Sequence, residues 1–219
     1  MTLKLYSHPF SSYCQKALIG FYENDIPVEL ALLEPGSPGS AELPRLWPMQ
    51  RFPVLTDGER VIPEATIIIE YLAVRYQGPV KLIPADPEAA VDVRFMDRFF
   101  DNYVMTPQGN IVINSLRPED KRDAFGVEQW RAMLDKSYAW LDERMAGRTW
   151  ASGEAFSLAD CAAAPSLLYA DWTHPIAKSM THLWAYRDRL LARPSYARAL
   201  DEARPYRHYF PLGAPEGRD

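Results

Sequence analysis

The spacing of apolar residues changes once along the sequence, at two proline-containing segments about a third of the way along the chain. Gly78-Pro79 and the stretch from Pro84 to Pro87 interrupt it, and Pro and Gly are the residues that most often separate structural elements. Before this interruption, segments with the apolar period of a strand alternate with segments that have the period of a helix. After it only the helical period remains. We therefore predict an α/β domain over 1–78, a linker over 79–88 and an all-α domain over 89–219.

Within the predicted first domain, strand and helix patterns follow a defined order. Leu3 and Leu5 flank Lys4 in a period-two run that predicts a short strand. Asp57-Gly58 stands between two apolar runs, which is a strong local signal for a hairpin. The other segments predict a helix over 12–23 and a strand over 28–33. The prolines at 44 and 48 allow only a short or irregular helix around them, and a last helix is predicted over 64–76. The expected order is strand, helix, strand, irregular helix, hairpin, helix.

The predicted second domain shows amphipathic helices, and one of its helix starts is encoded locally. Ser157 and Asp160 have the spacing of a capping box, in which each residue bonds the backbone of the other. Asp replaces the usual Glu or Gln, and its charge suits the positive end of a helix. A helix therefore begins next to Ser157.

The amino-acid composition is that of a folded globular protein. The chain has 219 residues, of which 47% are hydrophobic and 24% charged, as in an ordinary globular protein. No apolar run approaches the roughly 18 residues of a membrane span, and the first ten residues lack the pattern of a signal peptide. The formal net charge is −5, which disfavours nucleic-acid binding. We expect a cytoplasmic protein with no nucleic-acid or membrane partner.

Cysteine and histidine are too sparse for a metal centre. The two cysteines lie far apart in sequence, and the four histidines show no metal-ligand spacing. The chain also lacks the glycine-rich phosphate motifs and the GxSxG motif of many hydrolases. We expect no metal, no nucleotide cofactor of these types and no serine-hydrolase chemistry.

The junction between the first predicted strand and helix can carry chemistry. It reads Tyr6-Ser7-His8-Pro9-Phe10-Ser11-Ser12-Tyr13-Cys14, and the free N–H groups at a helix N-terminus favour an anion. Ser11 or Ser12 can donate a hydroxyl to a thiolate held there. Lowering a thiol pKa by two units is worth roughly 2.7 kcal/mol, which such contacts can supply. The alternative is that these serines only cap the helix.

Four motifs in order resemble the glutathione transferase family over nearly the whole chain. They are Ser11-Ser12-Tyr13-Cys14, Phe52-Pro53-Val54-Leu55, the run from Ile62 to Ile68, and Phe156-Ser157-Leu158-Ala159-Asp160. The resemblance implies a thioredoxin-like α/β N-terminal domain that binds glutathione, plus an all-α C-terminal domain that carries the hydrophobic-substrate site. It also implies a cytoplasmic homodimer that acts in detoxification on small-molecule electrophiles.

Ser11 falls where serine- and cysteine-type members of this family carry their catalytic residue. The resemblance therefore implies that Ser11 stabilises the glutathione thiolate, with Ser12 as the next candidate. Tyr6 and Tyr13 are rival hydroxyl donors, because some classes of the family use tyrosine. Cys14 keeps the place of a second cysteine but lacks a partner, and we interpret it as a packing residue.

The resemblance also implies a set of glutathione contacts. Phe52-Pro53 matches the family's cis-proline site, and Arg51 lies where a basic residue can meet the glycyl carboxylate. The family commonly has Ser where this chain has Ala65, so a hydroxyl contact is missing, and the hydroxyl of Thr66 is one replacement. The implied glutathione-binding residues are Phe10, Arg51, Phe52, Pro53, Glu64, Ala65 and Thr66.

For the second substrate, the resemblance points to aromatic residues of the helical domain. The candidates are Asn102, Tyr103, Tyr169 and Trp172, and core packing is the competing interpretation. The favoured function is a glutathione transferase acting on an apolar or aromatic electrophile. The alternatives are a glutathione-dependent reductase or dehalogenase, and a non-catalytic module that binds a ligand or a protein such as RNA polymerase.

Overall fold

The computed structural model describes residues 3–76 and 78–218. Its N-terminal part contains a four-stranded sheet in the order β2-β1-β3-β4. β1 (Leu3–Ser7) pairs in parallel with β2 (Glu29–Leu32). β3 (Val54–Asp57) pairs antiparallel with both β1 and β4 (Arg60–Pro63). The parallel pair requires a crossover, which α1 (Ser12–Glu23) supplies. The predicted strands and their order are confirmed.

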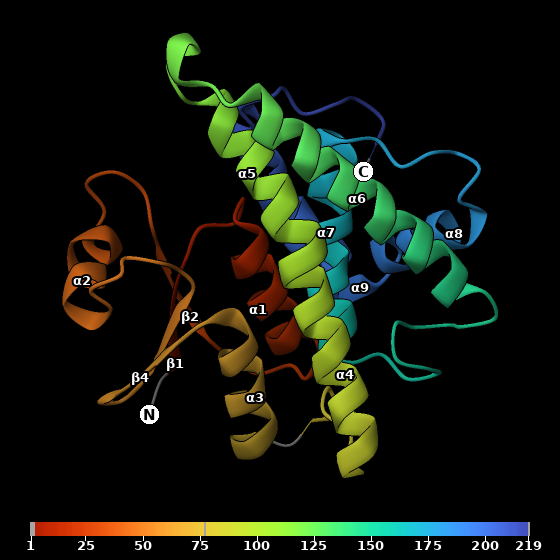
Figure 1. Cartoon of the computed structure of the whole chain (residues 1–219). Coiled ribbons are helices and arrows are strands. Elements are labelled where there is room, and N and C mark those ends of the chain that lie inside the picture. Colours follow the sequence, from red (N-terminus) through yellow and green to blue (C-terminus); the bar gives the residue numbers. More distant parts are fainter. Residues whose placement is uncertain (1–2, 77, 219) are drawn as a thin grey trace.

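Alternating residues of the sheet pack against helices on opposite faces. Leu5 and Leu55 lie in a core shared with α1 and with α3 (Ala65–Arg75). Tyr6 and Val54 face the other way, toward α2 (Pro38–Leu46). Figure 1 shows α2 on the side of the sheet away from α1 and α3. The period of two in the sequence thus sorts side chains between two cores.

The predicted hairpin exists, with its loop displaced by one residue. Asp57 still pairs with Arg60, so the two-residue loop is Gly58-Glu59 rather than Asp57-Gly58. Gly58 has a φ of 60°, a left-handed conformation that glycine adopts at little cost. The glycine therefore sets the turn, and Asp57 remains in β3.

The remaining described elements are helical, and three of them follow one another without a break. α4 (Pro87–Phe99) continues into a π-helical turn, η1 (Phe100–Met105), and then into α5 (Thr106–Ser115). Pro107 has no N–H to donate to the preceding turn, and the Ser137 hydroxyl donates to the Tyr103 carbonyl at 2.8 Å instead. Single π-helical turns of this kind are frequent at functional sites.

α7 (Leu158–Thr173) runs through the middle of the helical part (Figure 1). α8 (Thr181–Leu191) packs against α7, as do α1, α4, α5 and η1. The other later elements are η2 (Glu119–Lys121), α6 (Ala124–Met145), α9 (Pro194–Ala203) and η3 (Arg204–Tyr209). At the start of α7 the Asp160 carboxylate accepts a hydrogen bond from the Ser157 N–H at 2.9 Å, as the predicted capping box requires.

The sheet and the helical part meet where α1 packs against α7. The helical core accordingly includes Ile19 of α1 and Ile69 of α3. The division at 78 and the linker over 79–88 remain predictions. In the described part of the chain, no helix combines the length and apolarity needed to cross a membrane.

Candidate functional site

A cleft of about 410 Å³ lies beside the N-termini of α1 and α3, a volume within the range of small-ligand sites. Residues from the sheet part and from the α4–η1 helix line it together. They are Ser11, Tyr13, Gln50, Arg51, Phe52, Pro53, Glu64, Ala65, Arg98 and Asp101. Six of the residues predicted for the glutathione transferase site, which come from three separate segments, therefore lie around one space.

The segment before β3 forms one wall of this cleft. The Phe52-Pro53 peptide bond is cis, as the resemblance implied, and both residues line the cleft together with Arg51. Gln50, just before them, has a φ of 53°. A non-glycine residue in this region is strained and is found mainly where the surrounding structure holds it in place.

The start of α3 forms a second wall. Glu64 is the N-cap residue with a φ of 74°, so it too has a strained backbone at the cleft. Ala65 follows it as the first helical residue and is almost fully buried. The N–H groups of this first turn have no partner within the helix, and they can bind a carboxylate.

The hydroxyl of Thr66, one replacement for the hydroxyl that Ala65 lacks, is already bonded within the protein. It donates to Asp97 Oδ2 at 2.9 Å and accepts from Lys16 Nζ at 2.8 Å. The side chain is therefore committed to a buried ionic cluster, and only the backbone of Thr66 remains for a ligand.

This ionic cluster, formed by Lys16, Thr66, Asp97 and Asp101, joins both parts of the molecule beneath the cleft. Lys16 Nζ lies 2.6 Å from Asp97 Oδ1 and 2.9 Å from Asp101 Oδ2, and the lysine side chain is 1% exposed. Burial raises the pKa of Asp101, and the ammonium of Lys16 opposes that shift. The four-residue spacing of the two aspartates is the one sequence signal that could have revealed the cluster, because it places both on one helix face.

Asp101 belongs to the buried ionic cluster and also lines the cleft. Arg98 donates to Asp101 Oδ2 at 2.9 Å, and both residues line the cleft. Asp101 belongs to the π-helical turn, and its carboxylate accepts from Lys16 of α1. Sequence reasoning missed both residues, because charged residues on a helix usually lie on a solvated face.

Ser11 is the N-cap of α1, and its Oγ accepts a hydrogen bond from the Cys14 N–H at 3.4 Å. A hydroxyl that accepts in this way still has its own hydrogen to donate. Ser12 is the first residue of α1 and is not among the residues that line the cleft. The structure thus favours Ser11 over Ser12 by position.

The two rival tyrosines differ in where they point. Tyr13 lines the cleft, and burial, together with the nearby Asp101 carboxylate, raises its pKa. The Tyr6 hydroxyl donates to Glu42 on α2, which lies on the opposite face of the sheet. Tyr6 is therefore removed as a candidate, because its hydroxyl is turned away from the cleft.

Cys14 is fully buried, as the packing interpretation predicted. Burial raises the pKa of its thiol to about 12, so the reactive thiolate is scarce at neutral pH. Cys161 is also free and buried. No group of three potential metal ligands was found among the described residues.

Three of the predicted contact residues that do not line the cleft pack against one another instead. Tyr169 and Trp172 are only 5% and 7% exposed, and they pack with Phe10 and Phe210 in an aromatic cluster. Every residue from Leu158 to Trp172 is buried, so α7 presents no face to the solvent. The structure shows packing contacts for these three residues, and their roles in binding glutathione or the second substrate stay predictions.

The other two residues predicted for the second substrate are accessible. Asn102 and Tyr103 are exposed on the π-helical turn that also carries Asp101. The Tyr103 ring packs beside Phe99, with 5.3 Å between the ring centroids. Neither residue is among those that line the cleft.

Comparison with known proteins gives two family matches. Residues 5–80 match the profile of the glutathione S-transferase N-terminal domain, and residues 104–194 match that of the C-terminal domain. These two matches cover most of the chain.

Individual relatives are similar over nearly their whole length. The stringent starvation protein A homolog of Coxiella burnetii is 27% identical over 204 residues, which are 92% of each chain. Glutathione S-transferase hmp2 of Hypomyces subiculosus is 27% identical over 214 residues, or 93% of this chain and 100% of that one. A solved glutathione S-transferase from Methylobacterium radiotolerans, in complex with glutathione sulfonate, has a TM-score of 0.79 and 26% identity. That match covers 91% of this chain and 94% of the other.

Proposed function

Since this chain belongs to the glutathione S-transferase family, we propose that it is a glutathione transferase that activates the glutathione thiolate for attack on an apolar or aromatic electrophile. The observation that carries the proposal is the convergence of Ser11, the cis Phe52-Pro53 segment and the N-terminus of α3 on one cleft. Two relatives with similar sequences carry the name glutathione S-transferase.

Each charged or polar part of glutathione has a matching group in the cleft. The N–H groups at the start of α3 suit the γ-glutamyl carboxylate, and the carboxylate of Glu64 suits the neighbouring ammonium. The backbone of Phe52 can pair with the cysteinyl residue as a strand would. Arg51 suits the glycyl carboxylate. In this arrangement the sulfur lies near Ser11.

The chemistry requires glutathione to lose its thiol proton before it reacts, because the thiolate is the nucleophile. The Ser11 hydroxyl and the N-terminus of α1 stabilise that anion by a hydrogen bond and by the helix dipole. The thiolate then forms a bond to the electrophilic carbon, and the leaving group departs with its electron pair. Asn102 and Tyr103 are the proposed contacts for the electrophile.

Two other functions remain open, and different observations bear on them. A reductase that uses Cys14 is disfavoured, because burial raises the pKa of that thiol to about 12. A non-catalytic binding module gains support from two features of the chain. Ala65 lacks a hydroxyl while that of Thr66 is already bonded, and one relative is named a stringent starvation protein rather than a transferase.

Binding and turnover together test the proposal. We expect the protein to be retained on immobilised glutathione, to conjugate a chloronitrobenzene, and to bind a glutathione whose thiol titrates below its usual value of about 8.5. The ultraviolet absorbance of the thiolate during a pH titration measures the last property. Retention without turnover of any thiol acceptor would instead support the binding module.

The Ala65→Ser variant should bind glutathione about tenfold more tightly than the wild type. A serine here adds one hydroxyl donor to the carboxylate held at the start of α3, and a hydrogen bond to a charged group contributes roughly 1.5–3 kcal/mol. Calorimetric titration with glutathione measures the change. Unchanged or weaker binding would show that backbone N–H groups already satisfy that carboxylate.

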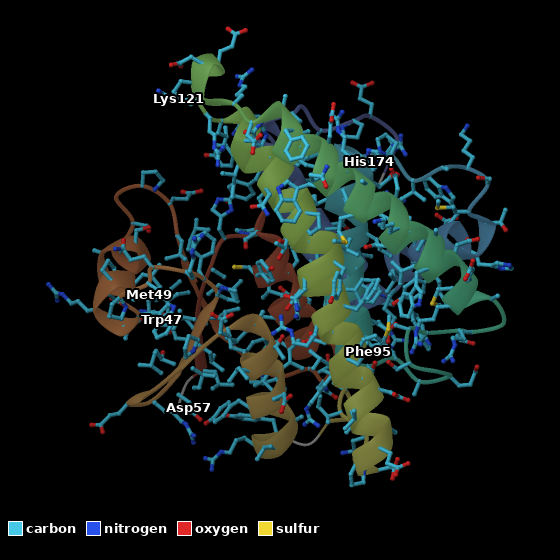
Figure 2. All side chains as sticks on the ribbon, in the orientation of Figure 1. Trp47, Met49, Asp57, Phe95, Lys121 and His174 are labelled. Carbon is cyan, nitrogen blue, oxygen red and sulfur yellow. The ribbon has the colours of Figure 1, made fainter. Side chains whose placement is uncertain are left out.

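Exposed apolar residues on neighbouring helices support a homodimer. Ile67 and Val74 of α3, and Val91 and Phe95 of α4, are all exposed, and Figure 2 shows Phe95 on α4. We propose that these faces meet those of a second copy, since exposed apolar patches commonly mark interfaces. Sedimentation velocity should show a dimer for the wild type and a monomer for Ile67→Glu. A wild-type monomer would contradict this proposal.

We further propose a cytoplasmic location and a role in detoxification. Both cysteines are free, which suits a reducing compartment, and conjugation by glutathione consumes reactive electrophiles. Cell fractionation tests the location.

A further inference from the structure

The loop that carries Ser11 is held by side chains from both parts of the molecule. Gln15 of α1 donates from Nε2 to the Pro9 carbonyl at 2.9 Å and to the Tyr169 hydroxyl oxygen at 3.0 Å. The Tyr169 hydroxyl in turn donates to the Phe10 carbonyl at 2.9 Å. Two successive carbonyls of the loop, directly before Ser11, are thereby bonded to buried side chains.

The direction of every bond in this chain is determined. A carbonyl oxygen can only accept, so Gln15 must present its NH₂ group to Pro9, and the Tyr169 hydroxyl must give its single hydrogen to Phe10. The Tyr169 oxygen is then left to accept from Gln15. Removing the Tyr169 hydroxyl therefore breaks the hydrogen bond to the Phe10 carbonyl. It also leaves one amide hydrogen of Gln15 without its partner.

Packing makes this hold rigid. Gln15 is fully buried and Tyr169 is 5% exposed. The rings of Phe10 and Tyr169 meet edge to face with 5.4 Å between their centroids, and Phe210 and Trp172 pack against the other sides of the Tyr169 ring. The tyrosine cannot rotate away without emptying a filled core.

We propose that Tyr169, on α7 of the helical part, is a positioning residue for the catalytic loop. Its hydroxyl sets the position of the Phe10 carbonyl and thereby that of the Ser11 hydroxyl, the next residue, which faces the cleft. The inference rests on the proposed function in one respect, because it assigns Ser11 to the glutathione thiolate. It gives the helical part a role in activating glutathione in addition to binding the second substrate.

Tyr169→Phe tests this proposal, because it removes one oxygen and keeps the ring that fills the core. We expect the pKa of the bound glutathione thiol to rise and kcat at neutral pH to fall about three- to tenfold, the size expected when one neutral hydrogen bond is lost. KM for glutathione should stay within about twofold of wild type, since the other contacts of the cleft are untouched. The backbone amides of His8, Phe10 and Ser11 should also exchange with solvent faster in the free protein.

Tyr138→Phe is the matched control. Tyr138 is 1% exposed, and its hydroxyl donates to the His174 carbonyl at 3.0 Å, far from the loop in sequence. The control should lose similar stability while keeping the wild-type thiol pKa, kcat and loop exchange. If Tyr169→Phe matches wild type in these three measurements, or if both variants change them equally, the positioning role is wrong.

The two proposals can fail separately. If wild-type protein does not lower the glutathione pKa, the proposed function fails, and hydrogen exchange in the ligand-free variants still decides whether Tyr169 holds the loop. Faster exchange in Tyr169→Phe alone supports the hold, and unchanged exchange overturns it.

Discussion

The Ser11→Ala variant should raise the pKa of the bound glutathione thiol by about one to two units, equivalent to roughly 1.4–2.7 kcal/mol. The reason is that the hydroxyl stabilises only the charged form of the sulfur, while the remaining contacts bind the rest of the tripeptide. Affinity for glutathione should therefore change little and kcat at neutral pH should fall by about ten- to a hundredfold. The thiolate absorbance in a pH titration measures the shift.

Two variants separate catalysis from helix capping. Ser11 is also the N-cap of α1, so the alanine variant will lose about 0.5–2 kcal/mol of stability whatever its role in catalysis. Ser12→Ala, at the first residue of the same helix, should leave the thiol pKa at its wild-type value. If Ser11→Ala titrates like wild type and Tyr13→Phe does not, Tyr13 is the donor.

The Lys16→Met variant should lose about 3–5 kcal/mol of unfolding free energy, the cost of leaving buried charges without their partner. Its ammonium is the buried cation between Asp97 and Asp101, and the Asp97 carboxylate, whose side chain is 1% exposed, cannot reach bulk water without opening the surrounding contacts. A loss of this size is a large part of the total stability of a typical domain. Denaturant unfolding followed by circular dichroism measures it.

Lys4→Met is the matched control for this substitution. Lys4 Nζ lies 3.1 Å from Glu42 Oε2 in a pair that is partly exposed, and exposed pairs of this kind contribute little. The control should unfold at nearly the wild-type denaturant concentration. If Lys16→Met also does so, the buried cluster does not hold the two parts together. Adding Asp97→Asn and Asp101→Asn to Lys16→Met should recover part of the loss.

The sequence alone predicted those features that depend on neighbours along the chain. The period of two in Leu3 and Leu5 predicted β1, and the spacing of Ser157 and Asp160 predicted the start of α7, because both patterns act within one element. The resemblance predicted the cis bond at Phe52-Pro53 and six of the residues that line the cleft. These came from the N-terminal part, where short motifs directly precede the elements that position them.

Only the tertiary structure decided the roles of residues that meet across the two parts. α7 is buried on every side, so its helical period could not show that Tyr169 packs in an aromatic cluster and bonds the loop before Ser11. Lys16 and Asp101 are 85 positions apart, and each resembles an ordinary surface charge in its own segment. Folding excludes water from the contact between the two parts, and a charge without water needs a partner of opposite sign. Lys16 therefore pairs with Asp101, and the hydroxyl of Thr66 is used within the same cluster.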